Sequence, residues 1–264
     1  MEGKSPKPKI EVQQIIKTYK DAKGQENQVL QEVDLKVYEK EFFCLLGVSG
    51  CGKSTLLRLM AGFDSPTAGN ILVDGKTMEA PRSDCIMIFQ DYGLFPWRNV
   101  LGNVEYGLEV LNVPTVERRG KALELIELVG LQDFVRAFPR ELSGGMKQRV
   151  ALARALAVEP EIIFMDEPLG ALDAITRLKM QDEIIRIWEE KNTTVVMVTH
   201  DINEAVYLGD RIAIMSGSKG NINKLLDIPL ERPRNRASHN FMKMQDHILS
   251  EFEISVAEDV EFCI

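Results

Sequence analysis

The stretch FFCLLGVSGCGKSTLLRLMAG, from Phe42 to Gly62, decides the fold of this chain. Its opening, FFCLLGV, is continuous in apolar residues, which is typical of a strand buried on both faces of a sheet. From Lys53 onward the pattern is that of a helix that ends at Gly62. Between strand and helix, Gly47–Ser54 matches G-x-x-x-x-G-K-[ST] at every required position. The sequence therefore predicts an α/β protein with a phosphate-binding loop.

The loop pattern predicts a role for each of its parts. Its glycines let backbone N–H groups point into one concavity, where they and the start of the helix attract phosphate. Lys53 is expected to reach the β- and γ-phosphates, and Ser54 to bind Mg²⁺. A glycine-rich turn with a coincidental Lys-Ser pair is the alternative, and both flanking elements disfavour it. The residues expected to bind nucleotide here are Gly47, Val48, Ser49, Gly50, Cys51, Gly52, Lys53, Ser54 and Thr55.

A second apolar strand, EIIFMDE, ends in two carboxylates. Asp166 is expected to hold Mg²⁺, directly or through water, and Glu167 to polarise the attacking water. A strand that simply ends in a solvated Asp-Glu pair is the alternative, and the lysine-containing loop in the same chain disfavours it. These two motifs alone leave kinases, motor proteins, GTPases and the ATPases of transporters open.

The rest of the chain alternates between strand and helix patterns. Asp74-Gly75 is typical of a hairpin turn. From about Val100 to Val158 the periodicity is helical, and after Pro160 strands return, each followed by a helix. Because strands that alternate with helices form parallel sheets, we expect a largely parallel sheet divided by a helical insert.

Composition excludes several classes of protein. Of the 264 residues, 45% are hydrophobic, and the net charge is −8, which argues against a nucleic-acid-binding partner because phosphate contacts need clustered Lys and Arg. No run of about 18 apolar residues is present, so no transmembrane helix is expected. The four cysteines, Cys44, Cys51, Cys85 and Cys263, lack metal-ligand spacing and are expected to be free thiols in a reducing cytosol.

A second glycine-containing stretch, LSGGMKQR from Leu142 to Arg149, resembles the signature motif of ATP-binding-cassette (ABC) ATPases. Met146 stands where Gln is common. Ser143 offers a hydroxyl, Gly144 and Gly145 offer N–H groups, and the helix dipole points the same way, so the stretch can hold a γ-phosphate. A serine that only caps a helix is the alternative.

The resemblance covers about Ile10 to Arg236 and implies further roles. Tyr19 lies where the family stacks an aromatic ring on adenine, although a surface tyrosine at a strand end is the alternative. Gln90 matches the loop glutamine that contacts Mg²⁺ and the attacking water. Asp173 matches the aspartate that crosses the dimer interface, with Gly170 in place of the commoner Ser. His200 matches the histidine that contacts the γ-phosphate, and ATP and Mg²⁺ are the implied cofactors.

The resemblance also implies an architecture. Residues 1–264 are expected to form a single ABC ATPase domain, with a RecA-like P-loop NTPase core and an N-terminal antiparallel β subdomain in 8–95 and 159–230. The helical subdomain with the signature motif is expected over 96–158. A C-terminal helical tail is expected over 231–264.

Partners and location follow from the same resemblance. In the family, the signature loop of one copy reaches the ATP held by another, so we expect a head-to-tail dimer with a second copy of the chain. The apolar and aromatic segment Gln90–Trp97 is expected to receive integral membrane permease subunits, with simple packing under the helical subdomain as the alternative. An extracytoplasmic solute-binding protein is an indirect partner. The expected location is the cytoplasmic face of the inner membrane, peripherally bound.

The class of transporter is indicated by three runs. Leu94-Phe95-Pro96-Trp97, VTHDINEAVYLGDRIAIMS and PLERPRNR, which ends at Arg236, most resemble the nitrate, sulfonate, taurine and bicarbonate importers. The implied function is ATP hydrolysis that powers uptake of a small anion. Another transporter class remains an alternative. An ABC ATPase of DNA repair or the ribosome is disfavoured by charge and by the single cassette, and a non-hydrolytic binding module by the intact lysine, carboxylates and His200.

Overall fold

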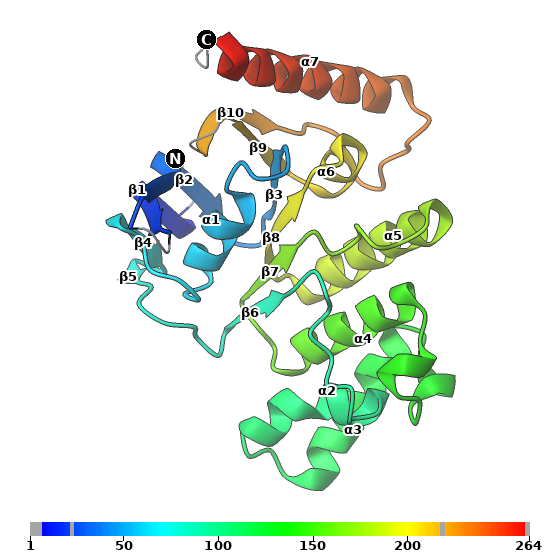
Figure 1. Cartoon of the computed structure of the whole chain (residues 1–264). Helices are drawn as coiled ribbons and strands as arrows, with labels where there is room; N and C mark the ends of the chain where they lie inside the picture. Colours follow the sequence, from blue (N-terminus) through cyan, green and yellow to red (C-terminus); the bar gives the residue numbers. More distant parts are fainter. Residues whose placement is uncertain (1–6, 22–23, 217–219, 262–264) are drawn as a thin grey trace, which may run out of the picture. The chain divides into compact units, whose positions relative to one another are not determined.

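The computed structural model describes residues 7–21, 24–216 and 220–261 of the chain. By their contacts the residues form two compact units, Met1–Arg82 with Thr194–Ile264, and Ser83–Thr193 (Figure 1). The phosphate-binding loop belongs to the first unit, and the carboxylate strand and the signature stretch belong to the second. Of the cysteines predicted to be free thiols, Cys263 lies outside the described residues, and the other three are buried and form no disulfide with one another.

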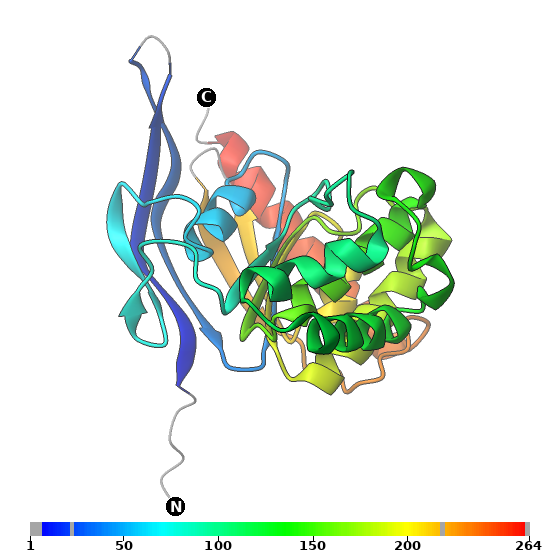
Figure 2. The same cartoon turned by 90° about the horizontal axis from the view of Figure 1, so that it is seen from below.

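An antiparallel sheet lies at the beginning of the first unit. Its strands are β1 (Pro8–Lys20), β2 (Glu26–Tyr38), β4 (Ala68–Val73) and β5 (Lys76–Thr77), in the order β2-β1-β4-β5. The long β1–β2 ribbon is seen in blue in Figure 2. Asp74 and Gly75 join β4 to β5 with φ of 54° and 76°, as a two-residue turn with both φ positive requires. The predicted hairpin is confirmed.

Gly69 is expected to be the glycine of this sheet that tolerates substitution least. Its φ is +87°, and an added Cβ would lie 2.3 Å from the Gln14 carbonyl oxygen and 2.5 Å from that of Gln13. Because both atoms belong to the paired β1 backbone, Gly69→Ala is expected to lower the free energy of unfolding by about 3–4 kcal/mol in urea denaturation.

Gly75→Ala is the matched control for this prediction. Gly75 also has a positive φ, but nothing lies within 4 Å of its added Cβ. The expected cost is therefore the backbone conformation alone, about 1–2 kcal/mol. Equal losses for the two variants would contradict the steric explanation.

The parallel strands of the first unit centre on β3 (Phe42–Gly47). It lies between β8 (Thr194–Thr199) and β9 (Arg211–Ser216) and is parallel to both, while β10 (Asn221–Asp227) pairs antiparallel with β9. Every residue of β3 and β8 is buried. This burial on both faces is the reason that FFCLLGV carries no alternating polar residues, and the predicted strand is confirmed.

Helices α1 (Lys53–Met60) and α6 (Ile202–Leu208) follow β3 and β8. Asp201 caps α6, since its carboxylate accepts from the amides of Asn203 (2.8 Å) and Glu204 (3.2 Å). The sequence indicates a reciprocal capping box with Glu204. In the structure the buried Glu204 carboxylate instead accepts from the Thr199 hydroxyl at 2.7 Å, and that hydroxyl accepts from the Asp201 amide. The Thr199 hydroxyl, at the end of β8, thus accepts from the Asp201 amide in place of the Glu204 carboxylate.

The C-terminal helix α7 (His239–Glu261) packs against α6 and β9 (Figure 1). Phe241 and Ile248 are buried, and the Phe241 ring lies 6.4 Å from that of Tyr207. The predicted terminal helix is confirmed.

The run PLERPRNR before α7 holds α6 in place. The buried Arg234 guanidinium donates to the carbonyl oxygens of Val206, Tyr207 and Gly209 at 2.6–3.1 Å. These are the carbonyls that a helix end leaves without intrahelical partners. Burial and the neighbouring Arg232 lower the pKa of Arg234 to about 10, so at neutral pH the guanidinium stays charged.

The second unit begins with the parallel pair β6 (Cys85–Ile88) and β7 (Ile162–Asp166), in which Ile88 is opposite Met165. Its helices are α2 (Val100–Val110), α3 (Thr115–Leu128), α4 (Gly144–Ala157) and α5 (Ala174–Lys191), with short 3₁₀ turns at Gln132–Phe134 and Pro139–Glu141. Helices α2, α3 and α4 pack on one another. The helical character predicted for the region between Val100 and Val158 is confirmed.

Candidate functional site

The phosphate-binding loop joins β3 to α1 in the predicted order. Lys53, the first residue of α1, is only 4% exposed, and its ammonium group donates to the carbonyl oxygens of Gly47 (2.9 Å) and Val48 (2.8 Å). The charge is therefore held over the loop by the loop's own backbone. Gly52 precedes α1 and has no side chain to accept from the first-turn amides, which suits the helix start to an anion.

His200 directly follows β8, next to the loop. Because β3 and β8 are parallel and Leu46 is opposite Thr199, His200 and the phosphate-binding loop leave the sheet at the same carboxyl edge. Ligands of open α/β sheets bind at this edge. The His200 side chain is exposed. The register of β3 and β8 thus places His200 and the phosphate-binding loop at the same edge of the sheet within the first unit.

Tyr19 lies near the end of β1 with its side chain 41% exposed. Its hydroxyl donates to the Asp64 carboxylate at 2.6 Å. Burial and Asp64 raise the pKa of Tyr19, and a hydrogen bond with the Thr55 side chain opposes that rise. Contact with Thr55 places the ring beside the first turn of α1, within the same unit as the loop.

In the second unit, Gln90 and the two carboxylates come from neighbouring parallel strands. Asp166 is the last residue of β7, Glu167 follows it with φ of 43°, and Gln90 follows β6 by two residues. Since Ile88 is opposite Met165, the three residues leave the β6–β7 pair at one edge. Within the second unit, the β6–β7 pair therefore brings together the three residues that the sequence predicts to act on Mg²⁺ and water.

The signature stretch forms the start of α4. Ser143 caps the helix, and its hydroxyl oxygen accepts from the Met146 amide at 3.3 Å. Ser143 therefore caps the helix, and this cap leaves the serine hydroxyl hydrogen for another acceptor. An added Cβ on Gly145 would lie 2.6 Å from Thr176 Cγ2, so only glycine fits without a shift.

Asp173 lies beside this stretch within the second unit. Its carboxylate caps α5 by accepting from the Thr176 amide at 3.0 Å. The hydrogen bonds from Thr176 lower the pKa of Asp173, so the carboxylate is charged at neutral pH. Thr176 therefore contacts both residues: its amide donates to Asp173, the predicted interface aspartate, and its methyl group lies next to Gly145.

An apolar cavity of about 410 Å³ opens beside the Gln90–Trp97 segment. Its walls include Phe89 and Phe95 of this segment and Tyr106 of α2, and the Phe95 and Tyr106 rings are 4.5 Å apart. Trp97 is 72% exposed, whereas Tyr92 is buried. The segment therefore has both properties that the sequence left open: part of it packs inside, and part of it is an exposed aromatic surface.

Arg154 is a residue of this surface that the sequence prediction missed. From α4, its guanidinium donates to the carbonyl oxygens of Gly93 (2.6 Å) and Tyr92 (2.9 Å) and lies over the Phe95 ring. Burial lowers the pKa of Arg154. A charged residue within the apolar run VALARALA was the available signal. Arg154 links the signature helix to the Tyr92–Gly93 backbone.

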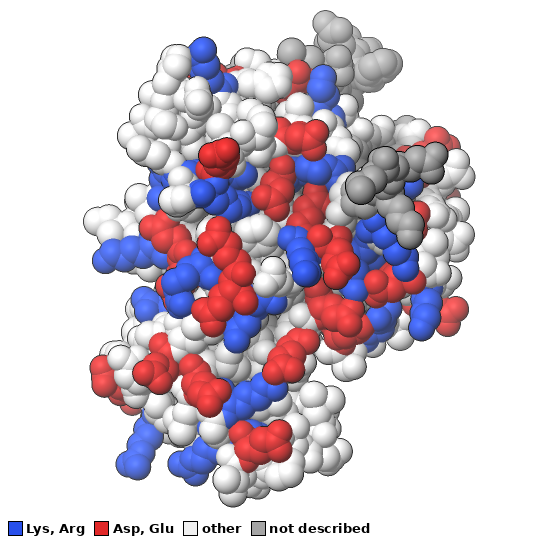
Figure 3. All heavy atoms as spheres, turned by 180° about the vertical axis from the view of Figure 1, so that it is seen from behind, with Lys and Arg blue, Asp and Glu red and all other residues white. Residues whose placement is uncertain are grey.

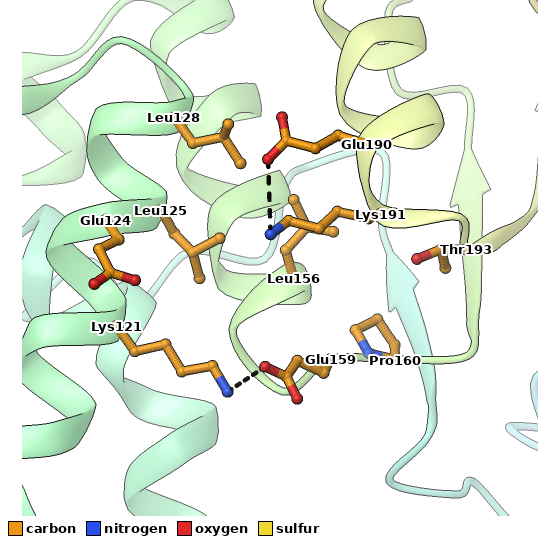
Figure 4. Close-up of a pocket in the computed structure, with 10 residues that line it drawn as sticks. All are labelled: Lys121, Glu124, Leu125, Leu128, Leu156, Glu159, Pro160, Glu190, Lys191 and Thr193. Atoms are coloured by element: carbon orange, nitrogen blue, oxygen red, sulfur yellow. Dashed lines mark ion pairs between the residues drawn. The ribbon is translucent and has the colours of Figure 1, made fainter.

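Another cavity, of about 360 Å³, lies between α3 and the C-terminal ends of α4 and α5 (Figure 4). Two ion pairs line it: Lys121 Nζ lies 2.7 Å from Glu159 Oε1, and Lys191 Nζ lies 4.0 Å from Glu190 Oε1. None of the residues predicted for nucleotide binding lines it.

Acidic and basic side chains are interspersed on the face seen in Figure 3. Among the helices of the described residues, none has the length and apolarity to cross a membrane. Within those residues no group of three or more His, Cys, Asp or Glu side chains could hold a metal ion.

The fold and these residues define a P-loop nucleotide-binding protein. The N-terminus of α4 is a second helix start that is suited to bind an anion. The family model described as ABC transporter matches residues 30–170, and the chain belongs to this family. It is an ATP-binding and ATP-hydrolysing subunit of the ABC type. The predicted fold class is thereby confirmed.

Several proteins resemble the chain over most of its length. An uncharacterised ABC transporter ATP-binding protein of Methanocaldococcus jannaschii is 47% identical over 92% of this chain and 91% of its own. The aliphatic sulfonates import ATP-binding protein of Bacillus subtilis is 48% identical over 90% and 92% of the two chains. The bicarbonate transport ATP-binding protein of a Synechocystis strain is 45% identical over 86% and 81%.

A solved structure of similar fold is a dimeric ATP-binding cassette in a post-hydrolysis state, bound to ADP and Pi. It has a TM-score of 0.75 and 34% identity, and covers 84% of this chain and all of its own. The resemblance that the sequence indicates, including that to the anion importers, is confirmed.

Proposed function

We propose that two copies of this chain bind and hydrolyse ATP to power the import of a small anion. The observation that carries the proposal is the presence in one chain of two helix starts suited to phosphate, at α1 and at α4. A single ATP needs only the first. The second has a use if it faces the ATP held by another copy, in a head-to-tail dimer.

In this proposal the residues act on ATP and water as follows. The loop from Gly47 to Thr55 and Lys53 bind the phosphates, and Tyr19 stacks on adenine. Glu167 polarises the water that attacks the γ-phosphate, and His200 contacts that phosphate. Ser143, Gly144, Gly145 and Asp173 act from the second copy. Donors aimed at the charge that develops on the γ-phosphate oxygens lower the barrier to hydrolysis.

The residues assigned to Mg²⁺ fit that ion by their chemistry. Ser54 offers a hydroxyl, Asp166 a carboxylate and Gln90 an amide oxygen, and Mg²⁺ prefers oxygen ligands and few protein side chains. When bound, the ion neutralises charge on the phosphates.

We further propose that integral membrane permease subunits bind at the Gln90–Trp97 segment and its cavity. The exposed Trp97 and the apolar walls suit a partner helix, because buried aromatic residues contribute strongly to interfaces. An extracytoplasmic solute-binding protein delivers the anion to the permease. The chain works at the cytoplasmic face of the inner membrane as one functional domain spanning residues 1–264.

The anion class is supported by the relatives named for aliphatic sulfonate import and bicarbonate transport. The test is to purify the native complex, reconstitute it in proteoliposomes, and measure phosphate release with its solute-binding protein. We expect loading with an alkanesulfonate, nitrate or bicarbonate to stimulate hydrolysis severalfold, and a neutral sugar to have no effect. Stimulation by nucleic acid, with none by any anion, would instead support a repair or ribosomal ATPase.

A further inference from the structure

Tyr19 is held in the first unit by a residue 45 positions later in the sequence. Asp64 lies in the loop after α1, and its Oδ2 accepts from the Tyr19 hydroxyl at 2.6 Å. Its Oδ1 accepts from the Lys17 ammonium at 2.7 Å and from the Ser65 amide at 2.8 Å. Both carboxylate oxygens therefore have donors, and one of these donors is the tip of the tyrosine ring.

Lys17 completes the arrangement from the same strand as Tyr19. Its side chain is only 10% exposed, and besides Asp64 its ammonium group donates to the Ser65 carbonyl oxygen at 2.7 Å. The same nitrogen lies 4.7 Å from the centroid of the Tyr19 ring. A cation at this distance is attracted to the face of the ring. One face of Tyr19 is thus covered by Lys17.

The ionisation of the two partners favours this arrangement. Burial acts to raise the pKa of Asp64, but hydrogen bonds from Lys17 and Tyr19 outweigh it and hold this pKa below its ordinary value. The carboxylate is therefore charged at neutral pH. Burial and the Asp64 carboxylate raise the pKa of Tyr19, so its hydroxyl remains the donor. The bond is of the charge-assisted kind, which is stronger than a bond between neutral groups.

Asp64 also relates the ring to the phosphate-binding loop. Asp64 follows the end of α1, and Thr55 in the first turn of α1 influences the pKa of the Tyr19 hydroxyl. The ring is therefore held by the loop that follows α1, the helix whose first residue is Lys53. An adenine ring and its phosphates need their two subsites at a constant separation, and α1 supplies the connection.

We propose that Asp64, together with Lys17, is a positioning residue that holds the Tyr19 ring in one orientation, with the face opposite Lys17 presented to adenine. The inference rests on the proposed function, in which Tyr19 stacks on adenine. Because the ring is ordered before the nucleotide arrives, binding does not have to order it. Without Asp64 the ring rotates freely, and each binding event carries that entropic cost.

The experiment is isothermal titration of the full chain with MgADP and, separately, with magnesium pyrophosphate. Asp64→Ala and Tyr19→Phe each remove the bond, and each is expected to weaken MgADP binding about three- to tenfold. Pyrophosphate binding is expected to stay unchanged, because it has no base. The double variant is expected to be no weaker than the weaker single variant, since both substitutions break one interaction. Asp64→Asn keeps an acceptor oxygen and is expected to restore most of the affinity.

Asp74→Ala is the matched control. Asp74 forms an ion pair at 2.9 Å with Lys9 of β1, whose side chain is 10% exposed, as is that of Lys17. It is expected to lower stability without changing MgADP affinity. The proposal is overturned if Asp64→Ala leaves MgADP affinity within twofold of the wild type, or weakens both ligands equally.

Tyr19→Ala separates this proposal from the one on which it rests. If Tyr19→Ala does not weaken MgADP binding, the stacking role itself is wrong. If Tyr19→Ala weakens binding but Asp64→Ala does not, stacking stands and only the positioning role is lost.

Discussion

Replacement of Glu167 by Gln is expected to reduce steady-state ATP hydrolysis by about two to four orders of magnitude while leaving MgATP binding intact. The carboxylate follows β7, where it can accept a proton from the attacking water, and the amide that replaces it cannot. Because ATP then persists, the variant is expected to accumulate as an ATP-bound dimer. Phosphate release measures the first effect, and size-exclusion chromatography with and without MgATP measures the second.

Glu161→Gln is the matched control for this experiment. Glu161 precedes β7 at its other end and is exposed. The same change of carboxylate to amide there is expected to leave hydrolysis and the elution position unchanged. A Glu167→Gln variant that remains a monomer at high MgATP would count against the head-to-tail dimer.

Replacement of Lys53 by Met is expected to weaken MgATP binding by about two orders of magnitude or more. Lys53 is 4% exposed and its ammonium group donates to the loop backbone, so it meets the phosphates with little competing water. A charge-assisted hydrogen bond contributes about 1.5–3 kcal/mol, and Lys53 can make more than one. Methionine keeps the aliphatic stem in its buried position, so the loss reports the charge.

Isothermal titration measures the affinity, and thermal denaturation without nucleotide checks the fold. Lys76→Met, at an exposed position of β5, is expected to change neither. Wild-type affinity in Lys53→Met would exclude this loop as the phosphate site.

Much of the candidate site could be predicted because its residues are close in sequence. The loop from Gly47 to Ser54 is a local conformation, and the spacing of its glycines, lysine and serine is enough to predict the position of each in the loop. The carboxylates at the end of β7 and the glycines at the start of α4 are equally local. These motifs identify the class of protein and the edge of the sheet at which each residue lies.

Contacts between distant segments were not predictable in the same way. Arg154 binds the carbonyl oxygens of Tyr92 and Gly93, which are 62 and 61 residues away. A contact nearer in sequence was also not predicted: at α6 the buried Glu204 carboxylate accepts from the Thr199 hydroxyl at the end of β8, and the expected capping box is changed. A charge within the apolar run VALARALA signals that Arg154 has a partner, but the sequence does not say which one, since an arginine or a glutamate on a helix is compatible with many partners.

The sequence by itself determined that this chain has a phosphate-binding loop, a carboxylate-ending strand and a signature stretch, because short-range spacing sets all three. It also indicated an aromatic ring at Tyr19. Only the tertiary structure decided how that ring is held, since Lys17 and Asp64 meet only after β1 and the loop after α1 have packed together. Local patterns specify which groups are present, and packing between distant segments specifies their orientation.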